Sequence, residues 1–287
     1  MSALLDSNGE ILLDSDGSAL EESGTLILGA MVLAQTVAAL PNQPLLGWRN
    51  FVSETDFTAS SETEFSPVSN LANPSTAFGW EATSTDDQQI DIENERPVDY
   101  LGIARHNLRG GAEMRIEFGV GGSFSVVINW FEVPTRQAIM FLFNEAQPDT
   151  VRIRIRDNAE PPAIAVAYLG RVTELQRRIY VGHTPVTMGR TVETVGGYSE
   201  NGQYLGEVTR REGRQTSVNL QNLTPSWYRS NLDPFLAQRP RRPAFFAWRP
   251  ESYPTEVGYV WLRGNPQPSN QRANGMMQVS MDFEAIT

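Results

Sequence analysis

The sequence predicts a mainly β protein, in which an antiparallel β-sandwich is followed by a second β-rich module with one short helix. Seven short segments with apolar or alternating residues lie between Gln89 and Leu169, separated by Gly, Pro, Asn and Ser residues. No connection between them has the apolar period of a helix, so the strands are expected to pair antiparallel. The best helix-start signal, Thr224-Pro225, comes only in the last quarter of the chain.

We divide the chain into an N-terminal arm (residues 1–45), a β-sandwich (46–172) and a C-terminal β-rich module (173–287). The arm begins with two similar stretches, LLDSNGE from Leu4 and LLDSDGS from Leu12, each with an Asx-Gly turn signal. This pattern predicts two short strands or a hairpin around Asn8-Gly9. Because this part is acidic and rich in turns, we expect it to contact a neighbouring subunit rather than to form a core.

The most apolar run of the chain, Thr25–Leu40, could in principle enter a membrane. It is shorter than the roughly twenty residues that a spanning helix needs, and it contains Gln35. Its upstream flank is acidic, whereas a secretory signal begins with basic residues. The sequence therefore predicts no membrane insertion, and either a buried strand pair or a core helix.

The sandwich is expected to contain seven strands. They lie at Gln89–Ile92, Tyr100–Ala104, Glu113–Phe118, Phe124–Phe131, Ala138–Phe143, Val151–Arg156 and Ala163–Leu169. The alternation is clearest in VRIRIRD, which predicts a strand with Ile153 on the inner face and Arg152, Arg154 and Arg156 on the outer one. These arginines either face solvent or form a ladder that meets the carboxylates of a neighbour.

Composition excludes several classes of enzyme. The chain has no cysteine and no lysine, which rules out thiolate nucleophiles, Schiff-base lysines and Walker-type phosphate loops. Its two histidines, His106 and His183, stand far apart in the chain and have no metal-ligand spacing. We therefore predict a protein that is not an enzyme, with no catalytic residues, no metal ligands and no cofactor; its binding residues stay open.

Charge is distributed unevenly along the chain. Residues 1–100 hold seventeen acidic residues and two arginines, whereas the remainder holds seventeen acidic residues and twenty-one arginines. This asymmetry either favours packing against like subunits or reflects solvated acidic loops. The net charge of −11 argues against a nucleic-acid partner, since such proteins must neutralise phosphates.

Two groups of acids are candidates for a glycosidase pair: Asp86 with Asp87, and Asp91 with Glu93. Glycoside hydrolysis needs two carboxylates that face each other across a sugar. Acids in a loop such as STDDQQ are normally ionised and solvated, so a catalytic pair is not expected there. A structural calcium ion in this loop is the stronger alternative, because carboxylate and carbonyl oxygens suit a hard cation.

Part of the sandwich sequence resembles the galactose-binding-like (discoidin-type) jelly rolls. The matching positions are Asn73-Pro74, Trp80, Ile90-Asp91-Ile92 and Val98–Leu108. The resemblance covers roughly residues 46–170, and Glu93-Asn94 replaces the usual Leu-Gly of the family. It implies a jelly roll in which His106-Asn107 ends a strand. For His106 a structural role is expected rather than catalysis, because no nucleophile lies beside it in the sequence.

The C-terminal module is expected to begin with a long hairpin. Its turn signals are Gly196-Gly197, Asn201-Gly202 and Glu212-Gly213. A helix near 225–237 follows, which Pro234 kinks or splits, and three strands close the sheet. The aromatic residues of this region form either the core between helix and sheet or a stacking surface for a sugar or a nucleic acid.

The last part of the chain resembles the C-terminal modules of tail-tip and minor tail proteins of tailed bacteriophages and gene transfer agents. The matching residues are Phe235-Leu236, Pro243–Pro250, Tyr259–Leu262 and Asn274–Glu284. The resemblance implies a virion structural protein of the tail tip, baseplate or fibre-attachment region, made in the cytoplasm of the bacterial host and located in the virion tail. Its partners would be other tail subunits and further copies of itself. The alternative function is a carbohydrate-binding protein that attaches to a host surface glycan.

Overall fold

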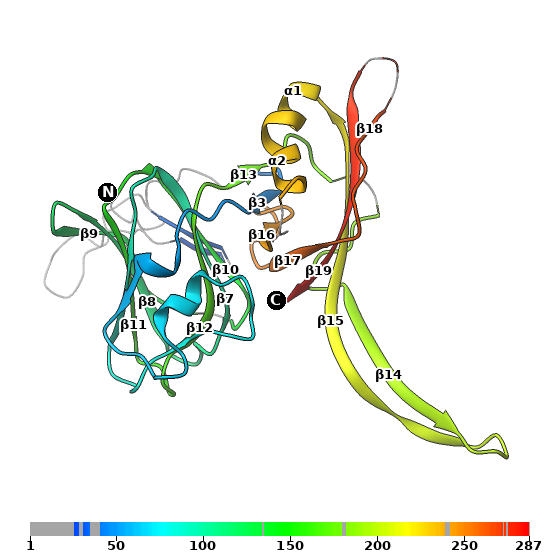
Figure 1. Ribbon diagram of the computed structural model, residues 1–287, viewed down its shortest axis with the longest axis horizontal. Helices are drawn as coiled ribbons and strands as arrows, with labels where there is room; N and C mark the ends of the chain where they lie inside the picture. The colour runs from blue at the N-terminus through cyan, green and yellow to red at the C-terminus, as the bar shows by residue number, and fades with distance from the viewer. Residues whose placement is uncertain are drawn as a thin grey trace, which may run out of the picture.

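The computed structural model describes residues 26–28, 31–34, 41–133, 135–179, 182–238, 242–271, 273 and 275–286. The hairpin predicted around Asn8-Gly9 lies outside these residues. Within them the protein is mainly β, as predicted, with three sheets and one short helical segment (Figure 1).

Two sheets form the predicted antiparallel sandwich. The inner sheet has the order β1-β2-β10-β7-β12-β5, and the outer sheet has the order β4-β6-β11-β8-β9. The inner strands are β1 (Leu26–Leu28), β2 (Met31–Leu33), β5 (Trp80–Glu81), β7 (Val98–His106), β10 (Ile139–Ala146) and β12 (Ala163–Gly170). The outer strands are β4 (Phe57–Ala59), β6 (Gln88–Glu93), β8 (Glu113–Val120), β9 (Ser123–Glu132) and β11 (Thr150–Arg156). All seven predicted strands are confirmed, and two 3-10 turns, η1 (Glu54–Asp56) and η2 (Val68–Ala72), precede β5.

The described part of the apolar run forms a strand pair that belongs to the sandwich. Strands β1 and β2 pair antiparallel, and β2 lies parallel to β10. Met31 and Val32 are fully buried there. Of the two structures expected for this run, the strand pair is therefore the one observed, and residues 26–28 and 31–33 are part of the chain's own inner sheet. No helix within the described ranges has the length and apolarity to cross a membrane.

The inner sheet is buried on both of its faces. Leu101 and Ile103 point into the core shared with the outer sheet, whereas Tyr100 and Ala104 point into a second core shared with the C-terminal module. The residues of β10 and β12 are accordingly apolar almost without interruption. In β6 and β11 apolar and polar residues alternate, because one face of these strands is solvated. The molecule is thus layered: outer sheet, inner sheet, C-terminal sheet and helical segment.

The C-terminal sheet has the order β13-β3-β16-β17-β19-β15-β14, and β18 pairs with β19. Its strands are β3 (Leu45–Gly47), β13 (Thr173–Glu174), β14 (Arg190–Tyr198), β15 (Tyr204–Leu223), β16 (Ala244–Ala247), β17 (Val257–Arg263), β18 (Ser269–Asn270) and β19 (Met277–Ile286). Strand β3 precedes the sandwich in sequence but pairs with β16 and β13. The boundary expected at residue 46 therefore runs through a strand of this sheet.

The predicted helix is present as three consecutive pieces. They are α1 (Pro225–Trp227), the π turn η3 (Tyr228–Leu232) and α2 (Asp233–Leu236). Pro234 lies in the first turn of α2, where its missing N–H is tolerated. Tyr228 and Phe235 are buried against the C-terminal sheet. Both rings thus belong to the core between helix and sheet, one of the two alternatives for the aromatic residues.

The hairpin of the C-terminal module turns at only one of the three predicted points. Gly202 has a φ of 78° in the turn between β14 and β15. Gly196-Gly197 and Glu212-Gly213 were wrongly predicted as turns, since they lie within the strands. A Cβ on Gly196 would lie 2.6 Å from the side chain of Glu207. A glycine there therefore permits a close approach of the two strands rather than a reversal of the chain.

Aromatic residues join the sandwich to the C-terminal sheet. The ring of Phe245 lies against Gly102 of the inner sheet, where an added Cβ would come within 2.6 Å of it. Tyr168 and Tyr259 flank the same ring, with centroids 5.6 Å and 5.1 Å from it. Because glycine leaves room for Phe245, the two modules pack closely and share one core.

Candidate functional site

A cleft of about 450 Å³ lies where one end of the sandwich meets the C-terminal module. Its lining residues are Arg105, His106, Asn107, Arg136, Ala163 and Ile286. They come from the end of β7, the segment before β10, the start of β12 and the end of β19. Ligand sites are frequent at such junctions between modules, because two rigid bodies shape one concave surface.

Arg105 reaches the cleft through an unusual backbone conformation. In a regular strand its side chain would follow Leu101 and Ile103 into the core of the sandwich. Its φ of 56° is instead in the left-handed region, which costs a residue with a Cβ roughly 1–2 kcal/mol. The guanidinium group is thereby exposed rather than buried. Strained positions of this kind are often found at functional sites.

His106 lies under the cleft and connects two of its walls. Only 7% of its surface is exposed, and its Nε2 lies 2.9 Å from the carbonyl oxygen of Gln137. Burial lowers the pKa of His106, and the charge of Arg136 acts in the same direction. The imidazole is therefore neutral at pH 7 and donates its Nε2 proton to Gln137. This contact holds the end of β7 beside the segment that carries Arg136.

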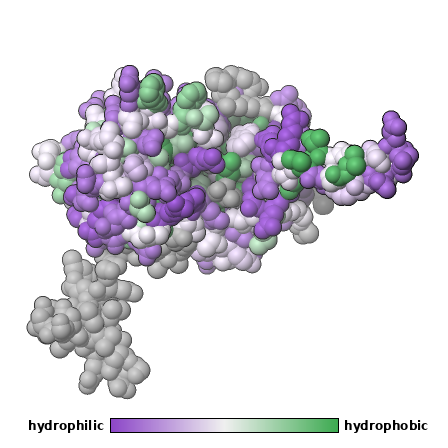
Figure 2. Space-filling view, turned by 90° about the horizontal axis from the view of Figure 1, so that it is seen from below, coloured by the Kyte–Doolittle hydropathy of each residue, from purple (hydrophilic) through white to green (hydrophobic). Residues whose placement is uncertain are grey.

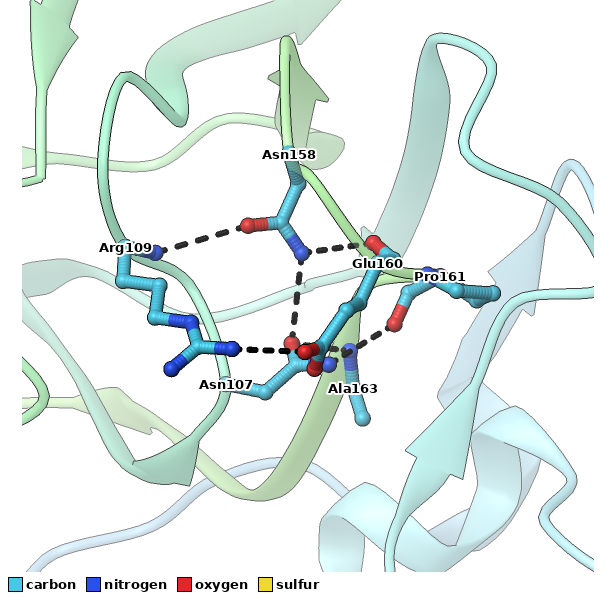
Figure 3. Close-up of polar contacts among 6 residues, drawn as sticks. All are labelled: Asn107, Arg109, Asn158, Glu160, Pro161 and Ala163. Atoms are coloured by element: carbon cyan, nitrogen blue, oxygen red, sulfur yellow. Dashed lines mark hydrogen bonds and ion pairs between the residues drawn. The ribbon is translucent and has the colours of Figure 1, made fainter.

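Asn107 holds the floor of the cleft together (Figure 3). Its side-chain amide donates to the carbonyl of Pro161 at 2.8 Å and accepts from the backbone N–H of Ala163 at 2.8 Å. Asn158 donates to the carbonyl of Glu160 at 2.7 Å. These bonds tie the loop after β7 to the loop before β12. They are the strand-end contacts expected for the asparagine of the His106-Asn107 pair.

An ion pair closes the same loops on the outside. Arg109 and Glu160 lie 2.6 Å apart, and about half of each side chain is exposed (Figure 3). The backbone N–H of Arg109 also donates to the side chain of Asn158. Because these polar groups bind one another, the cluster is a rigid support for the cleft and not a reactive centre.

The cleft has a positive electrostatic character. Arg105 and Arg136 are both exposed and line it, and no acidic side chain does. Among the described residues, no ion pair involves either guanidinium. Guanidinium groups bind carboxylates through two parallel hydrogen bonds. The arrangement is therefore suited to an anionic group.

The acids considered from the sequence do not converge on a site. Asp91 accepts two hydrogen bonds from Arg152 at 2.7 Å and 2.9 Å on the outer sheet, and Asp86 accepts one from Ser84 in its loop. His183 lies in the other module, where Nδ1 is 3.0 Å from the carbonyl of Ser217. Across the part of the chain that the structure describes, no three acidic or histidine side chains form a group that could hold a metal ion.

The arginines of β11 bind within their own sheet. Arg152 pairs with Asp91, and Arg156 pairs with Glu113. Arg156 also lies over the ring of Trp130, with 4.2 Å between the guanidinium carbon and the ring centroid. Partners within the chain therefore occupy Arg152 and Arg156, and a ladder of three arginines offered to a neighbour does not form. Arg154 lies between Gln89 and Arg115 and contacts Trp130.

The sequence did not indicate Arg105 or Arg136 as site residues. The nearest signal is the His106-Asn107 pair, whose predicted place at a strand end brings it next to the cleft. Arg136 joins it through the pairing of β10 with β7, which is a contact between distant parts of the chain.

No protein-family model matches the sequence, and no curated protein matches it. Several solved structures of carbohydrate-binding modules are similar to the chain. The family 32 module of C. perfringens NanJ, in complex with galactose, is 14% identical and has a TM-score of 0.36 over 43% of this chain and 98% of that one. Chitosan-binding module 1 from a chitosanase/glucanase of Paenibacillus sp. IK-5 is 13% identical, with a TM-score of 0.38 over 42% and 98%. The family 32 module of AlyQ, in complex with 4,5-unsaturated mannuronic acid, is 16% identical, with a TM-score of 0.34 over 43% and 96%.

Proposed function

We propose that this protein is a non-catalytic carbohydrate-binding protein that holds an acidic sugar in the cleft between its modules. The observation that carries the proposal is the pair Arg105 and Arg136, which line one cleft with no carboxylate partner among the described residues. A uronic acid offers one carboxylate for a guanidinium group and several hydroxyls for neighbouring polar groups. The backbone strain at Arg105 is consistent with a side chain that is held in place for binding.

The surroundings of the two arginines fit a sugar better than a bare anion. The side-chain amide of Asn107 has a second N–H besides the one that it donates to Pro161, and Ile286 supplies an apolar wall. Small-molecule sites commonly combine apolar walls with a few polar groups that fix orientation. The stretch Val98–Leu108, which carries the resemblance to galactose-binding-like domains, ends at this cleft.

The lining of the cleft argues for binding without turnover. A glycosidase needs two carboxylates on opposite sides of the scissile bond, and the lining residues include none. The imidazole of His106 is largely buried and already bound to Gln137. The chemistry available is therefore recognition of charge and hydroxyl groups.

Calorimetric titration of the full chain with acidic and neutral oligosaccharides tests the proposal. We expect binding to oligomers of galacturonic or mannuronic acid and weaker binding to neutral galactose oligomers. A charge-assisted hydrogen bond contributes about 1.5–3 kcal/mol, so Arg136→Ala should weaken binding at least about tenfold. Arg105→Gly should do the same while keeping the fold, because glycine accepts the left-handed φ at this position.

Arg154→Ala is the matched control. It removes the same charge from the outer sheet, away from the cleft, and should change affinity less than about twofold. Equal losses in all three variants would indicate attraction by overall charge and not a site. Absence of binding to every acidic and neutral oligomer would overturn the proposed function.

A second candidate function is a subunit of a larger assembly, such as the tailed-phage virion that the C-terminal motifs resemble. The observation that favours it is a two-stranded hairpin that projects from the C-terminal sheet with exposed apolar side chains. Purified virions would contain the protein at a fixed stoichiometry if this candidate is correct. Its presence only as a free protein in lysates would contradict it.

A further inference from the structure

The hairpin leaves the body of the molecule as a long two-stranded ribbon (Figure 1). Residues 214–223 of β15 pair with β19 and belong to the C-terminal sheet. Residues 204–213 of β15 pair only with β14. We call β14, the turn after it and residues 204–213 the hairpin arm. An isolated pair of strands is at best marginally stable in water, so the hairpin arm lacks the support that the other strands have.

Apolar side chains of the hairpin arm are in contact with solvent, and Figure 2 shows them as patches along the projecting part. The exposed fractions are 56% for Val192, 59% for Val195, 74% for Tyr198, 58% for Tyr204, 68% for Leu205 and 72% for Val208. Directly paired residues share a face of the ribbon, as Val195 does with Val208 and Tyr198 with Tyr204. Because strand residues alternate between faces, these two pairs lie on opposite sides. A partner that covers the hairpin arm must therefore surround its tip.

The outer edge of β14 is open. Among the described strands it pairs only with β15, and residues 190–198 contain no proline. The only charged residues of this strand are Arg190 and Glu193. Exposed edges are normally protected by charges, prolines or a covering segment. The edge of β14 is thus able to accept another strand.

The molecule also has a receptive surface at the base of the hairpin arm. A cleft of about 660 Å³ lies there, and its charged lining residues are Arg190, Arg263 and Asp282, beside the apolar Met188. Met188 is 63% exposed, and Arg190 is exposed as well. The tip of the arm carries Glu200 beside its two tyrosines. The charged lining residues of the base carry one net positive charge and the tip carries one negative charge, so the two are complementary, and each has exposed apolar side chains.

When two copies pair through their β14 edges, the strand register brings the tip of one hairpin arm to the base cleft of the other. Antiparallel pairing of two β14 edges about a two-fold axis at Thr194 places Tyr198 of one copy opposite Arg190 of the other. The tip of each hairpin arm then reaches the base cleft of its partner. Such a contact is isologous and closed, since each copy contributes the same surface.

Charge and area both suit this contact. The hairpin arm with its base holds four arginines and four glutamates between residues 190 and 214, although the whole chain carries −11. Two copies can thus meet here without repulsion of like charges. The six exposed apolar side chains contribute roughly 100 Å² each, so two arms expose about 1,200 Å², the lower end of a stable interface.

We propose that the hairpin arm docks on a second copy of this chain, through pairing of the β14 edges and seating of each tip in the partner's base cleft. The interaction uses surfaces separate from the carbohydrate cleft. Tests of this dimer contact are therefore independent of tests of carbohydrate binding.

Disulfide trapping tests the register directly, because the full chain has no cysteine of its own. A residue on the two-fold axis of an antiparallel pair faces its own copy within the range of a disulfide. Thr194→Cys should give a covalent dimer under mild oxidation. Thr209→Cys is the matched control, since Thr209 pairs with Thr194 inside the same arm and lies one strand further from the axis. Equal cross-linking of both variants would overturn the register.

Charge exchange tests the contact between tip and base. In sedimentation experiments at about 5–200 µM, the unaltered chain should be a dimer. Glu200→Arg alone should raise the dimer dissociation constant at least about fivefold, and so should Arg190→Glu. Combining the two should restore the affinity, because the pair is reversed rather than removed. A combination as weak as the worse single variant would contradict the contact.

A final comparison tests whether dimerisation requires the apolar side chains of the hairpin arm or any exposed apolar side chains. Val195→Asp with Val208→Asp should abolish dimerisation, while Val120→Asp at the end of β8 with Val126→Asp on the edge strand β9 should leave it unchanged. Both pairs are exposed, so neither should unfold the protein, and circular dichroism verifies this. A monomeric unaltered chain at the highest concentration, or loss of the dimer only in the variant at Val120 and Val126, would overturn the proposal.

Discussion

At the scale of single residues, backbone conformation and burial decide which side chains can act. Arg105 is available to the cleft because its left-handed φ turns it away from the sandwich core. His106, the next residue, is buried and bound to Gln137. Two neighbouring residues at the end of β7 thus have opposite environments, and only His106 was predicted to lie at a strand end. The difference depends on one φ angle, which the sequence pattern does not indicate.

The burial of His106 leads to a prediction about pH. Its pKa is lowered in the folded protein by burial, whereas in the unfolded chain it is near 6.5. The unfolded state therefore binds more protons as the pH falls below about 6.5, and the free energy of unfolding should decrease in that range. Urea unfolding at pH 7.5 and pH 5.5 measures this loss.

The variant His106→Gln is the control for that experiment. Its amide can donate to Gln137 but does not titrate, so its stability should depend less on pH. Some dependence should remain, because burial also lowers the pKa of His183. A nuclear magnetic resonance titration in which His106 gains its proton at or above pH 6.5 would contradict the prediction.

At the scale of the element, two kinds of strand can be distinguished by their sequence. Strand β11 alternates, with Ile153 fully buried and Arg154 on the solvated face. Strand β12 is apolar almost throughout, because sheets cover both of its faces. The sequence thus indicated the strands correctly. A strand that is apolar on both faces, such as β12, also indicates that a further layer, here the C-terminal sheet, covers its second face.

Substitutions in β11 test the assignment of its faces. Ile153→Ala should lower the free energy of unfolding by about 2–5 kcal/mol, because it leaves a cavity in the core of the sandwich. Arg154→Ala should change it by less than about 0.5 kcal/mol, since the residue is at the surface and has no ion pair among the described residues. Chemical denaturation of both variants supplies the values. Similar losses for the two would show that the outer face of the sheet is covered.

At the scale of the whole molecule, the sandwich and the C-terminal module behave as one packed body. Strand β3 comes before the sandwich in sequence and pairs in the C-terminal sheet, so the chain crosses between modules more than once. Phe245 fills the space over Gly102, and the hydroxyl groups of Tyr168 and Tyr259 lie 3.3 Å apart. Separate folding of the two modules would leave this shared core open to water.

The shared core predicts a single cooperative unfolding transition. Tryptophan fluorescence and far-ultraviolet circular dichroism should give the same midpoint for the full chain. Phe245→Ala should lower the free energy of unfolding by about 3–5 kcal/mol in both signals, because the ring is fully buried. Phe65→Ala, at a position that is 89% exposed, is the control and should cause no shift. Two separate midpoints would contradict the shared core.

The sequence by itself determined the kind of protein: its strands, the helical segment near residue 225, and the absence of cysteine and lysine chemistry. These properties depend on local pattern and composition, which need no knowledge of distant contacts. Of the candidate site, only the place of His106-Asn107 at a strand end was accessible in this way.

Only the tertiary structure decided which surfaces can bind. Arg136 meets Arg105 through strand pairing, and the cleft exists because the end of β19 packs beside β7 and β12. The hairpin arm likewise follows from the length of β15, half of which pairs within the sheet and half outside it. Alternation of apolar and polar residues along a strand shows which face of the strand is buried, but not which element packs against that face. A binding site is formed by the elements that pack together, so the sequence pattern alone does not locate it.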